Sequence, residues 1–226
     1  MPSFPARLLP LLYLAGPTLP VGAFAWSQGL ETACAEGAVR DAASLKERLL
    51  TLLHFGLERF DLPVFLRCCA AAGKGATEEF LYWDRLIFAG RESAELWLEE
   101  EQTGKALCRL LREQGMWPES LRDRVCGYTA AFALAATGLA PCPGDGQDAA
   151  CAYAWNRMES QANAACRCLP LGQSAVQRVL LDIMPAIAGS VGRATRTADE
   201  DIGSSLPGTV LASCRHERQY SRMFRS

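Results

Sequence analysis

The sequence is poor in histidine and has no excess of positive charge. Only His54 and His216 occur in 226 residues, far apart and without neighbours at metal-ligand spacing, so a zinc site or a histidine-based hydrolase would have to be assembled from isolated residues. The pair His216-Glu217 does not continue as H-E-x-x-H, because position 220 is tyrosine. A formal net charge of −2 lacks the basic excess of a nucleic-acid-binding protein. These absences argue against a metalloenzyme and against a nucleic-acid partner.

The sequence also lacks a nucleotide-binding loop and a disulfide framework. No G-x-x-x-x-G-K-[ST] stretch occurs, so the chain does not bind a nucleotide by that route. The ten cysteines show no repeated C-x-x-C spacing, and most stand among alanine and leucine, which predicts reduced, buried thiols in the cytosol. Cys166 and Cys168 would point to different sides of a helix. A structural role is expected there, with a soft-metal site as the alternative.

The region from Leu8 to Leu30 contains no charged residue. Its length alone would suggest a membrane-spanning helix. However, Pro10, Pro17 and Pro20 remove backbone donors and disfavour the α conformation of the residues before them. We therefore expect short, kinked pieces. A signal peptide with a small-x-small cleavage site near residue 25 is the alternative, but the pattern continues beyond that site as one structural element.

Elsewhere, apolar residues recur every three or four positions, which predicts helices, and strand-like alternation is nearly absent. His54 lies near the apolar side of its helix and is expected to be an ordinary packing histidine. We expect an all-α fold, a single irregular bundle of about eight to ten helices over residues 1–226, with an apolar N-terminal segment at 1–22 and a tail at 214–226. The predicted helices cover 41 to about 59, 61 to about 73–75, 77–90, 92–114, 121–135, 151–169 and 176–191, the last kinked or divided by Pro185.

Local signals set some of the expected boundaries. Asp41 is a candidate N-cap. Asp61 followed by Pro63 is typical of a new helix start, because an acceptor side chain precedes a proline in the first turn. The uncharged run Val125–Gly144 is expected to form a closely packed, buried helix rather than a membrane span, because alanine gains little from lipid. The expected loops are Pro141–Gly146 and Asp199–Gly208.

Three segments carry ordered motifs. They are Gly16–Glu31 (GPTLPVGAFAWSQGLE), then Trp155, Gln161 and Arg167 with Leu169–Gln173 (LPLGQ), and finally His216-Glu217 with Tyr220–Ser226 (YSRMFRS). Together they resemble the urease accessory protein F (UreF) family, whose opening signature reads approximately S-P-x-L-P-V-G-x-F-x-x-S-x-G-L-E. This sequence departs from the family pattern at Gly16, where serine is usual, and at Met223, where leucine is usual. The resemblance extends over the whole chain.

The resemblance implies a function in urease maturation. UreF proteins pair as homodimers, bind the accessory protein UreD and recruit the GTPase UreG to apo-urease, where GTP hydrolysis is coupled to nickel delivery. The resemblance also implies a cytoplasmic, non-enzymatic scaffold. Such a scaffold has no metal site and no tightly bound cofactor of its own, since nickel is handled by the complex. Neither a membrane nor a nucleic acid is an expected partner. The alternative is a cytosolic helical enzyme or small-ligand carrier unrelated to urease, for which the cysteines and aromatic residues would supply a site between helices.

The candidate partner-binding residues lie in the first and third motifs. The bend around Pro20 and Gly22 would present an aromatic anchor beside a charge, or the same residues would form a core turn. The tail combines arginines with aromatic residues, the composition of a binding hot spot. We expect it to become ordered when a partner binds, with a frayed terminus as the alternative. The candidates are Phe24, Trp26, Ser27, Glu31, Tyr220, Arg222, Phe224 and Arg225.

Two further interpretations concern arginines. Arg167 and Leu171 are expected at the homodimer contact, although Arg167 could equally complement the dipole at a helix C-terminus. Arg222 falls on the arginine of the family's carboxyl-terminal signature. It could act as an arginine finger on the partner GTPase or make a simple ion pair.

Overall fold

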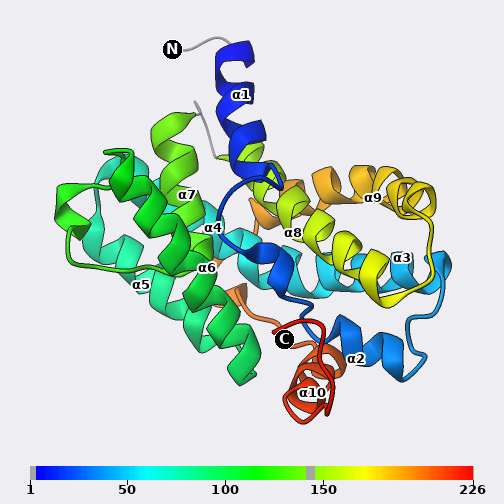
Figure 1. Cartoon of the computed structure of the whole chain (residues 1–226). Helices are drawn as coiled ribbons and strands as arrows, with labels where there is room; N and C mark the ends of the chain where they lie inside the picture. The colour runs from blue at the N-terminus through cyan, green and yellow to red at the C-terminus, as the bar shows by residue number, and fades with distance from the viewer. Residues whose placement is uncertain (1–3, 141–145, 226) are drawn as a thin grey trace.

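The computed structural model describes residues 4–140 and 146–225 and shows a bundle of helices (Figure 1). No strand occurs in these two ranges, and the predicted all-α fold is confirmed. The α-helices are α1 (Phe4–Ala15), α2 (Leu30–Ala35), α3 (Ala42–Thr51), α4 (Leu62–Lys74), α5 (Thr77–Ala89), α6 (Ala94–Glu113), α7 (Tyr128–Leu139), α8 (Gln147–Cys168), α9 (Gln173–Ala194) and α10 (Pro207–His216). Single 3₁₀ turns form η1 (Ala23–Ala25), η3 (Glu119–Leu121) and η4 (Asp199–Asp201), and η2 (Leu52–Asp61) is π-helical.

Helix α4 lies between two groups of helices. It packs against α5 and α7 on one side and against α8 and α9 on the other (Figure 1). Its Phe65 ring stacks on Tyr153 of α8 at 4.7 Å between centroids and meets Phe132 of α7 edge-on at 6.0 Å. All three rings are fully buried, and such contacts stabilise a core beyond the area that they bury. Helices α2 and α10 pack against each other at the lower end of the view.

The expectation of short pieces is confirmed, because η1 at Ala23–Ala25 and α2 from Leu30 follow α1 as separate elements. Helix α1 itself differs from the expectation at Pro10. It runs from Phe4 to Ala15 with Pro10 inside it, so the prediction of a break at this proline is wrong. A proline within a helix removes one backbone hydrogen bond, and packing compensates here, because Leu11 and Leu14 are buried against α7 and α8. The chain leaves the helix only beyond Ala15.

The predicted helix after Asp61 is confirmed in its range, because α4 covers Leu62–Lys74 with Pro63 in its first turn, but the expected break before it is absent. Asp41 does cap α3, in a reciprocal arrangement with Ser44, but α3, η2 and α4 then follow one another without a break. Asp61 has helical backbone angles, and its side chain makes no cap. Pro63 cannot donate to the preceding turn, and the Arg59 carbonyl instead accepts the N–H of Gly203 at 3.1 Å. A distant loop therefore replaces the hydrogen bond that proline removes.

Helix α7 begins later than its apolar pattern predicts. Leu121 lies in η3 and Val125 is exposed, and α7 starts at Tyr128. Two carboxylates fix this start, because Asp84 accepts the N–H of Gly127 at 2.9 Å and Glu100 accepts that of Thr129 at 2.7 Å. Acidic groups are favoured at a helix N-terminus. The prediction of a closely packed, buried helix is confirmed over Tyr128–Leu139, whereas residues 141–145 lie outside the described ranges.

The last three helices differ from the predictions in detail. Helix α9 continues through Pro185, so division at that residue is wrong. It is the one helix in the described ranges that is long and apolar enough to cross a membrane, and here it packs along α3 and α8. Helix α8 begins earlier than expected, at Gln147, and α10 begins at Pro207, inside the region predicted as a loop.

Gly104 allows α6 to approach the start of α7 closely. A Cβ atom at this position would lie 2.4 Å from the carbonyl oxygen of Cys126 and 2.7 Å from the amide nitrogen of Tyr128. Because both are backbone atoms, we expect Gly104→Ala to separate the two helices and lower the free energy of unfolding by about 2 kcal/mol. Gly138→Ala is the matched control, since a Cβ there meets no described atom within 4 Å, and alanine should stabilise the helix by about 0.5–1 kcal/mol. Urea denaturation tests this difference, and equal stability of the two variants would contradict it.

A buried ion-pair network joins the start of α6 to its neighbours. The Arg91 guanidinium lies 2.6 Å from Asp61 Oδ1 and 2.8 Å from Glu100 Oε2. Arg157 of α8 pairs with Glu99 at 2.9 Å. Burial alone would raise the pKa of Asp61, but Arg91 holds that pKa below its ordinary value. The charges are therefore compensated inside the bundle, which is the condition under which a protein tolerates buried charge.

Asp84 is a buried carboxyl group outside this ion-pair network. Burial raises its pKa to about 7. The pKa of Asp84 in the folded chain lies above its ordinary value of 3.8. Between these two pKa values, the folded chain therefore binds more protons than the unfolded chain. Stability contributed by neutral Asp84 is therefore present at low pH and is lost as the pH rises toward 7.

Asp84→Asn should remove this pH dependence. Asparagine keeps an acceptor for the N–H of Gly127 and has no charge to bury, so we expect the variant to be more stable than the parent near pH 8 and about as stable near pH 4. Urea midpoints at several pH values measure the effect. Asp123→Asn, in an exposed turn, is the control. A parallel pH dependence of Asp84→Asn and the parent would contradict the assignment.

His54 is half-buried, and its ring contacts a polar cluster. This position agrees with the structural role expected for this histidine. Its Nδ1 lies 3.1 Å from Glu58 Oε2 and 3.2 Å from the Ser190 hydroxyl. Arg193 binds both oxygens of Glu58 at 2.7 and 2.8 Å and holds the pKa of that carboxyl at about 2. The cluster ties η2 to α9.

Candidate functional site: the junction of bend and tail

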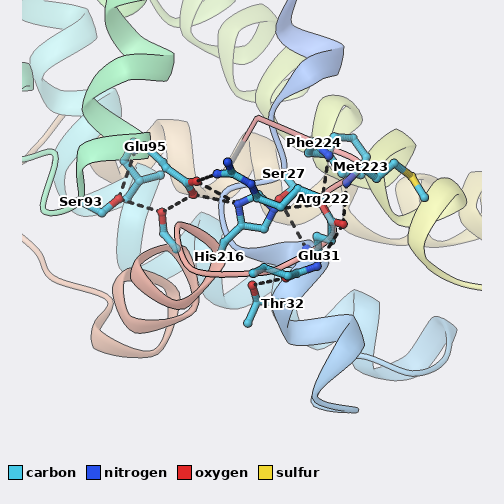
Figure 2. Close-up of polar contacts among 12 residues, drawn as sticks. Ser27, Glu31, Thr32, Ser93, Glu95, His216, Arg222, Met223 and Phe224 are labelled. Atoms are coloured by element: carbon cyan, nitrogen blue, oxygen red, sulfur yellow. Dashed lines mark hydrogen bonds and ion pairs between the residues drawn. The ribbon is translucent and has the colours of Figure 1, made fainter.

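The C-terminal tail meets the bend that follows α1 and the start of α2. After α10 the tail turns back over α2 and over the bend that follows α1 (Figure 1). Figure 2 shows the polar contacts made there, with Glu31, Glu95 and His216 at their centre. We call this region the junction and define it by Glu31, Glu95, His216, Arg222 and Phe224.

Glu31, in the first turn of α2, binds the tail through its carboxylate. One oxygen accepts the backbone N–H of Met223 at 2.8 Å, and the other accepts that of Phe224 at 3.0 Å. The amide of Gln219 donates to the same carboxylate at 3.3 Å. Burial alone would raise the pKa of Glu31, but these N–H donors and His216 hold it below its ordinary value. An ionised carboxylate is the state that accepts several hydrogen bonds at once.

His216 connects α2 to α6. Its ring is completely buried, with Nε2 2.9 Å from Glu31 Oε2 and Nδ1 3.0 Å from Glu95 Oε1 (Figure 2). Each nitrogen of the ring thus faces a carboxylate oxygen, and the histidine links the two acidic residues. Burial raises the pKa of Glu95, whose oxygen also accepts from Arg222 at 3.4 Å.

The end of α8 covers the aromatic residue of the tail. The Arg167 guanidinium lies 4.5 Å from the centre of the Phe224 ring, a cation–π distance. The N–H of Arg225 donates to the carbonyl of Ala25 at 2.8 Å. The three sequence motifs are far apart along the chain but contact one another in this region.

The tail packs against its own chain. This differs from the expectation that it becomes ordered only when a partner binds, and also from the alternative of a frayed terminus. Phe224 is only 5% exposed, because its ring fills the space beside the bend and below Arg167. Trp26 and Ser27 are likewise buried, so the expectation that these three residues face a partner is wrong for the chain as folded here. The core-turn interpretation holds for Trp26 and Ser27.

Other predicted residues, in the junction or close to it in sequence, are exposed. Phe24 is 74% exposed and Tyr220 is fully exposed. Arg222 and Arg225 are also exposed. Beside Phe24, a pocket of about 100 Å³ lies between the bend and α8. Leu171 is half-buried against the core. The homodimer contact proposed for Leu171 and Arg167 stays a prediction.

Sequence reasoning missed two parts of the junction. Glu95 was not singled out, because an acidic residue in the first turn of a helix is common. Gly29 was not singled out either, although a Cβ there would lie 2.7 Å from the amide nitrogen of Ser213 and its φ is +72°. The glycine of the S-x-G-L-E pattern was the signal that could have revealed this close approach of α10.

The cysteines differ partly from the predicted buried thiols. The described ones are all free thiols, but only Cys68, Cys108 and Cys126 are buried, and Cys214 is exposed. Cys142 lies outside the described ranges. Within residues 4–140 and 146–225, no group of three histidine, cysteine, aspartate or glutamate residues could hold a metal ion.

Comparison with known proteins agrees with the motifs. The UreF family model matches residues 39–184. The urease accessory protein UreF of Chromohalobacter salexigens is 43% identical, over 98% of this chain and 96% of that protein. The UreF of Hahella chejuensis is 39% identical over 98% of this chain and 99% of its own length. The possibility of a protein unrelated to urease is thereby excluded. The chain belongs to the UreF family of urease accessory proteins.

Proposed function

We propose that the chain is a non-catalytic scaffold of urease maturation, which binds UreD and recruits the GTPase UreG to apo-urease. GTP hydrolysis by UreG is then coupled to nickel delivery, with nickel handled by the complex and no cofactor held tightly by this chain. It acts in the cytoplasm as a homodimer, without a membrane or nucleic-acid partner. The observation that supports this proposal is the exposure of two aromatic rings and two arginines, Phe24, Tyr220, Arg222 and Arg225, on the bend and the tail that the junction holds together.

The composition of this surface suits protein binding. Phe24 and Tyr220 each expose a large ring to solvent, and aromatic residues with arginine dominate binding hot spots. The junction holds the backbone beneath them through the Arg225–Ala25 hydrogen bond and the Glu31 contacts. A surface already ordered before binding loses less conformational entropy when a partner arrives.

The contact that Arg222 makes with its own chain favours an anchoring role over a role as an arginine finger. Its guanidinium already contacts Glu95, and that ion pair holds the side chain against the body of the protein. To enter the active site of a GTPase, the side chain would have to leave this contact. We therefore propose that Arg222 supports the surface and pairs with a carboxylate of the partner.

Pull-down of the partners tests the proposal. Phe24→Ser and Tyr220→Ala change exposed rings, so we expect the helical circular-dichroism signal to stay unaltered. Each variant should retain about tenfold less of the cognate UreD and UreG proteins than the parent does, with or without GTP. Tyr82→Ala is the matched control, since this tyrosine is also exposed but lies on α5. If the Phe24 and Tyr220 variants both retained UreD and UreG as strongly as Tyr82→Ala does, the proposed surface would be refuted.

A further inference from the structure

A pocket lies between helix α3 and the start of α10. Its volume is about 330 Å³, and in Figure 1 it falls where α10 and α2 lie below α3. One side of α3, the connection from α2 to α3 and the first turn of α10 form its walls. The lining includes Val39, Arg48, Thr51, Gly208 and Thr209. The pocket therefore combines a guanidinium group, hydroxyl groups and the N-terminus of a helix.

Arg48 has no carboxylate partner in the described part of the chain. Its Nη2 atom donates to the carbonyl of Gln28 at 2.8 Å, while its Nε atom is buried without a hydrogen-bond partner in residues 4–140 and 146–225. Arg91 and Arg157, by contrast, each pair with a buried carboxylate. Burial lowers the pKa of the Arg48 guanidinium. Because a desolvated charge without a counter-ion is unfavourable, an anion in the pocket would stabilise this side chain.

The N-terminus of α10 lies in the wall of the same pocket. The helix has ten residues, and no side chain caps its start. Within the described ranges, the backbone N–H of Gly208 in the first turn donates to no acceptor. The first N–H groups of a helix carry partial positive charge and bind anions, since they have no acceptor within the helix. Arg48 and α10 thus present two independent groups that favour negative charge to one space.

We propose that this pocket binds a phosphate group, either as inorganic phosphate or as part of a phosphorylated small molecule. Arg48 supplies the ion pair, and the N–H of Gly208 with the hydroxyl groups of Thr51 and Thr209 supplies hydrogen bonds to the phosphate oxygens. These donors come from two helices, and a tetrahedral phosphate accepts from several directions at once. A planar carboxylate, with two oxygens, matches them less well.

Two other features of the lining bear on the ligand. The side chains of Val39 and Leu206 provide an apolar wall, which an organic group attached to the phosphate would contact. Glu47 is the one acidic residue among the described lining residues, and it is exposed, so that water and salt screen its charge. Glu47→Gln should therefore strengthen phosphate binding. The site belongs to this chain alone and does not depend on the proposed partners.

Calorimetric titration of the full chain with inorganic phosphate and with phenyl phosphate tests the site, at an ionic strength held constant with sodium chloride. We expect saturable binding that Arg48→Gln weakens by about tenfold or more, because charge-assisted hydrogen bonds are lost. Lys46→Gln is the matched control and should bind as the parent does. It removes one positive charge from the same helix at an exposed residue outside the pocket.

The two ligands distinguish the possible sources of the phosphate group. Tighter binding of phenyl phosphate would support a phosphorylated small molecule, because its ring can contact the apolar wall. Equal binding of both ligands would support inorganic phosphate. Absence of saturable binding to the parent, or an equal affinity of the Arg48 and Lys46 variants, would overturn the proposal.

A second measurement covers the case in which Arg48→Gln folds poorly. In an NMR titration of the parent chain, phosphate should shift the backbone amide signal of Gly208 and the Nε–H signal of Arg48, and should leave the amide of Lys46 unchanged. A Gly208 signal that did not respond to phosphate would contradict the site. Weaker binding by Glu47→Gln than by the parent would contradict it as well.

Discussion

Replacing Arg91 by methionine should lower the free energy of unfolding by about 3–5 kcal/mol, the largest loss that we expect from one substitution. Methionine fills much of the same space but leaves Asp61 and Glu100 facing each other inside the bundle without their shared cation. Removing one partner of a buried ion pair is costly, because the remaining charge stays desolvated. Urea denaturation followed by circular dichroism measures the loss.

A pH series separates lost charge compensation from lost packing. In the variant, burial without Arg91 favours neutral Asp61, so we expect the deficit to be smaller near pH 5 than near pH 8. Arg122→Met is the control, because the ion pair of Arg122 with Glu119 is exposed and should contribute less than about 1 kcal/mol. A deficit of the Arg91 variant that matched this control, or that did not change with pH, would contradict the importance of the network.

Glu31→Gln should release the tail and lower the free energy of unfolding by about 3 kcal/mol. The new amide cannot accept from Met223, Phe224 and His216 together, and one of its ends is itself a donor. Once the tail leaves, the Phe224 ring loses its cover. Limited trypsin digestion should then cut after Arg222 far faster than in the parent, before the helical signal changes.

The neighbouring acidic residue on the same segment provides the control for this prediction. Glu36 forms an exposed ion pair with Arg215 of α10, and such pairs contribute little to stability. We expect Glu36→Gln to keep both the parental unfolding midpoint and the slow cleavage of the tail. Equal protection of the tail in the Glu31 and Glu36 variants would show that the carboxylate of Glu31 does not hold it.

Local sequence signals predicted most helices but not every boundary. The Asp41 cap was readable because the groups that satisfy it lie within the same turn. The helical backbone that continues through Asp61 and Pro63 was not predicted, since the donor that binds the Arg59 carbonyl comes from Gly203, far along the chain. The start of α7 likewise depends on Asp84 and Glu100 from other helices. Boundaries set by distant groups leave no local pattern.

The candidate site was predicted in its parts but not in its assembly. The motifs identified the bend, the end of α8 and the tail, yet they did not predict that the segments contact one another. Glu31 and Met223 are 192 positions apart, and no periodicity links them. The composition of the tail suggested a surface for partners, whereas Arg167 and the bend already cover Phe224. Phe24, Tyr220, Arg222 and Arg225 retain the exposure expected of contact residues.

The closure of the bend by the tail also affects how the protein is made. Residues 25–31 leave the ribosome long before residues 223–225, which contact them. The nascent chain must therefore keep its bend uncovered until synthesis has passed residue 225. A product truncated before Arg222 would leave apolar side chains of the bend open to chaperones and proteases, so the cell could distinguish unfinished molecules from finished ones at this one place.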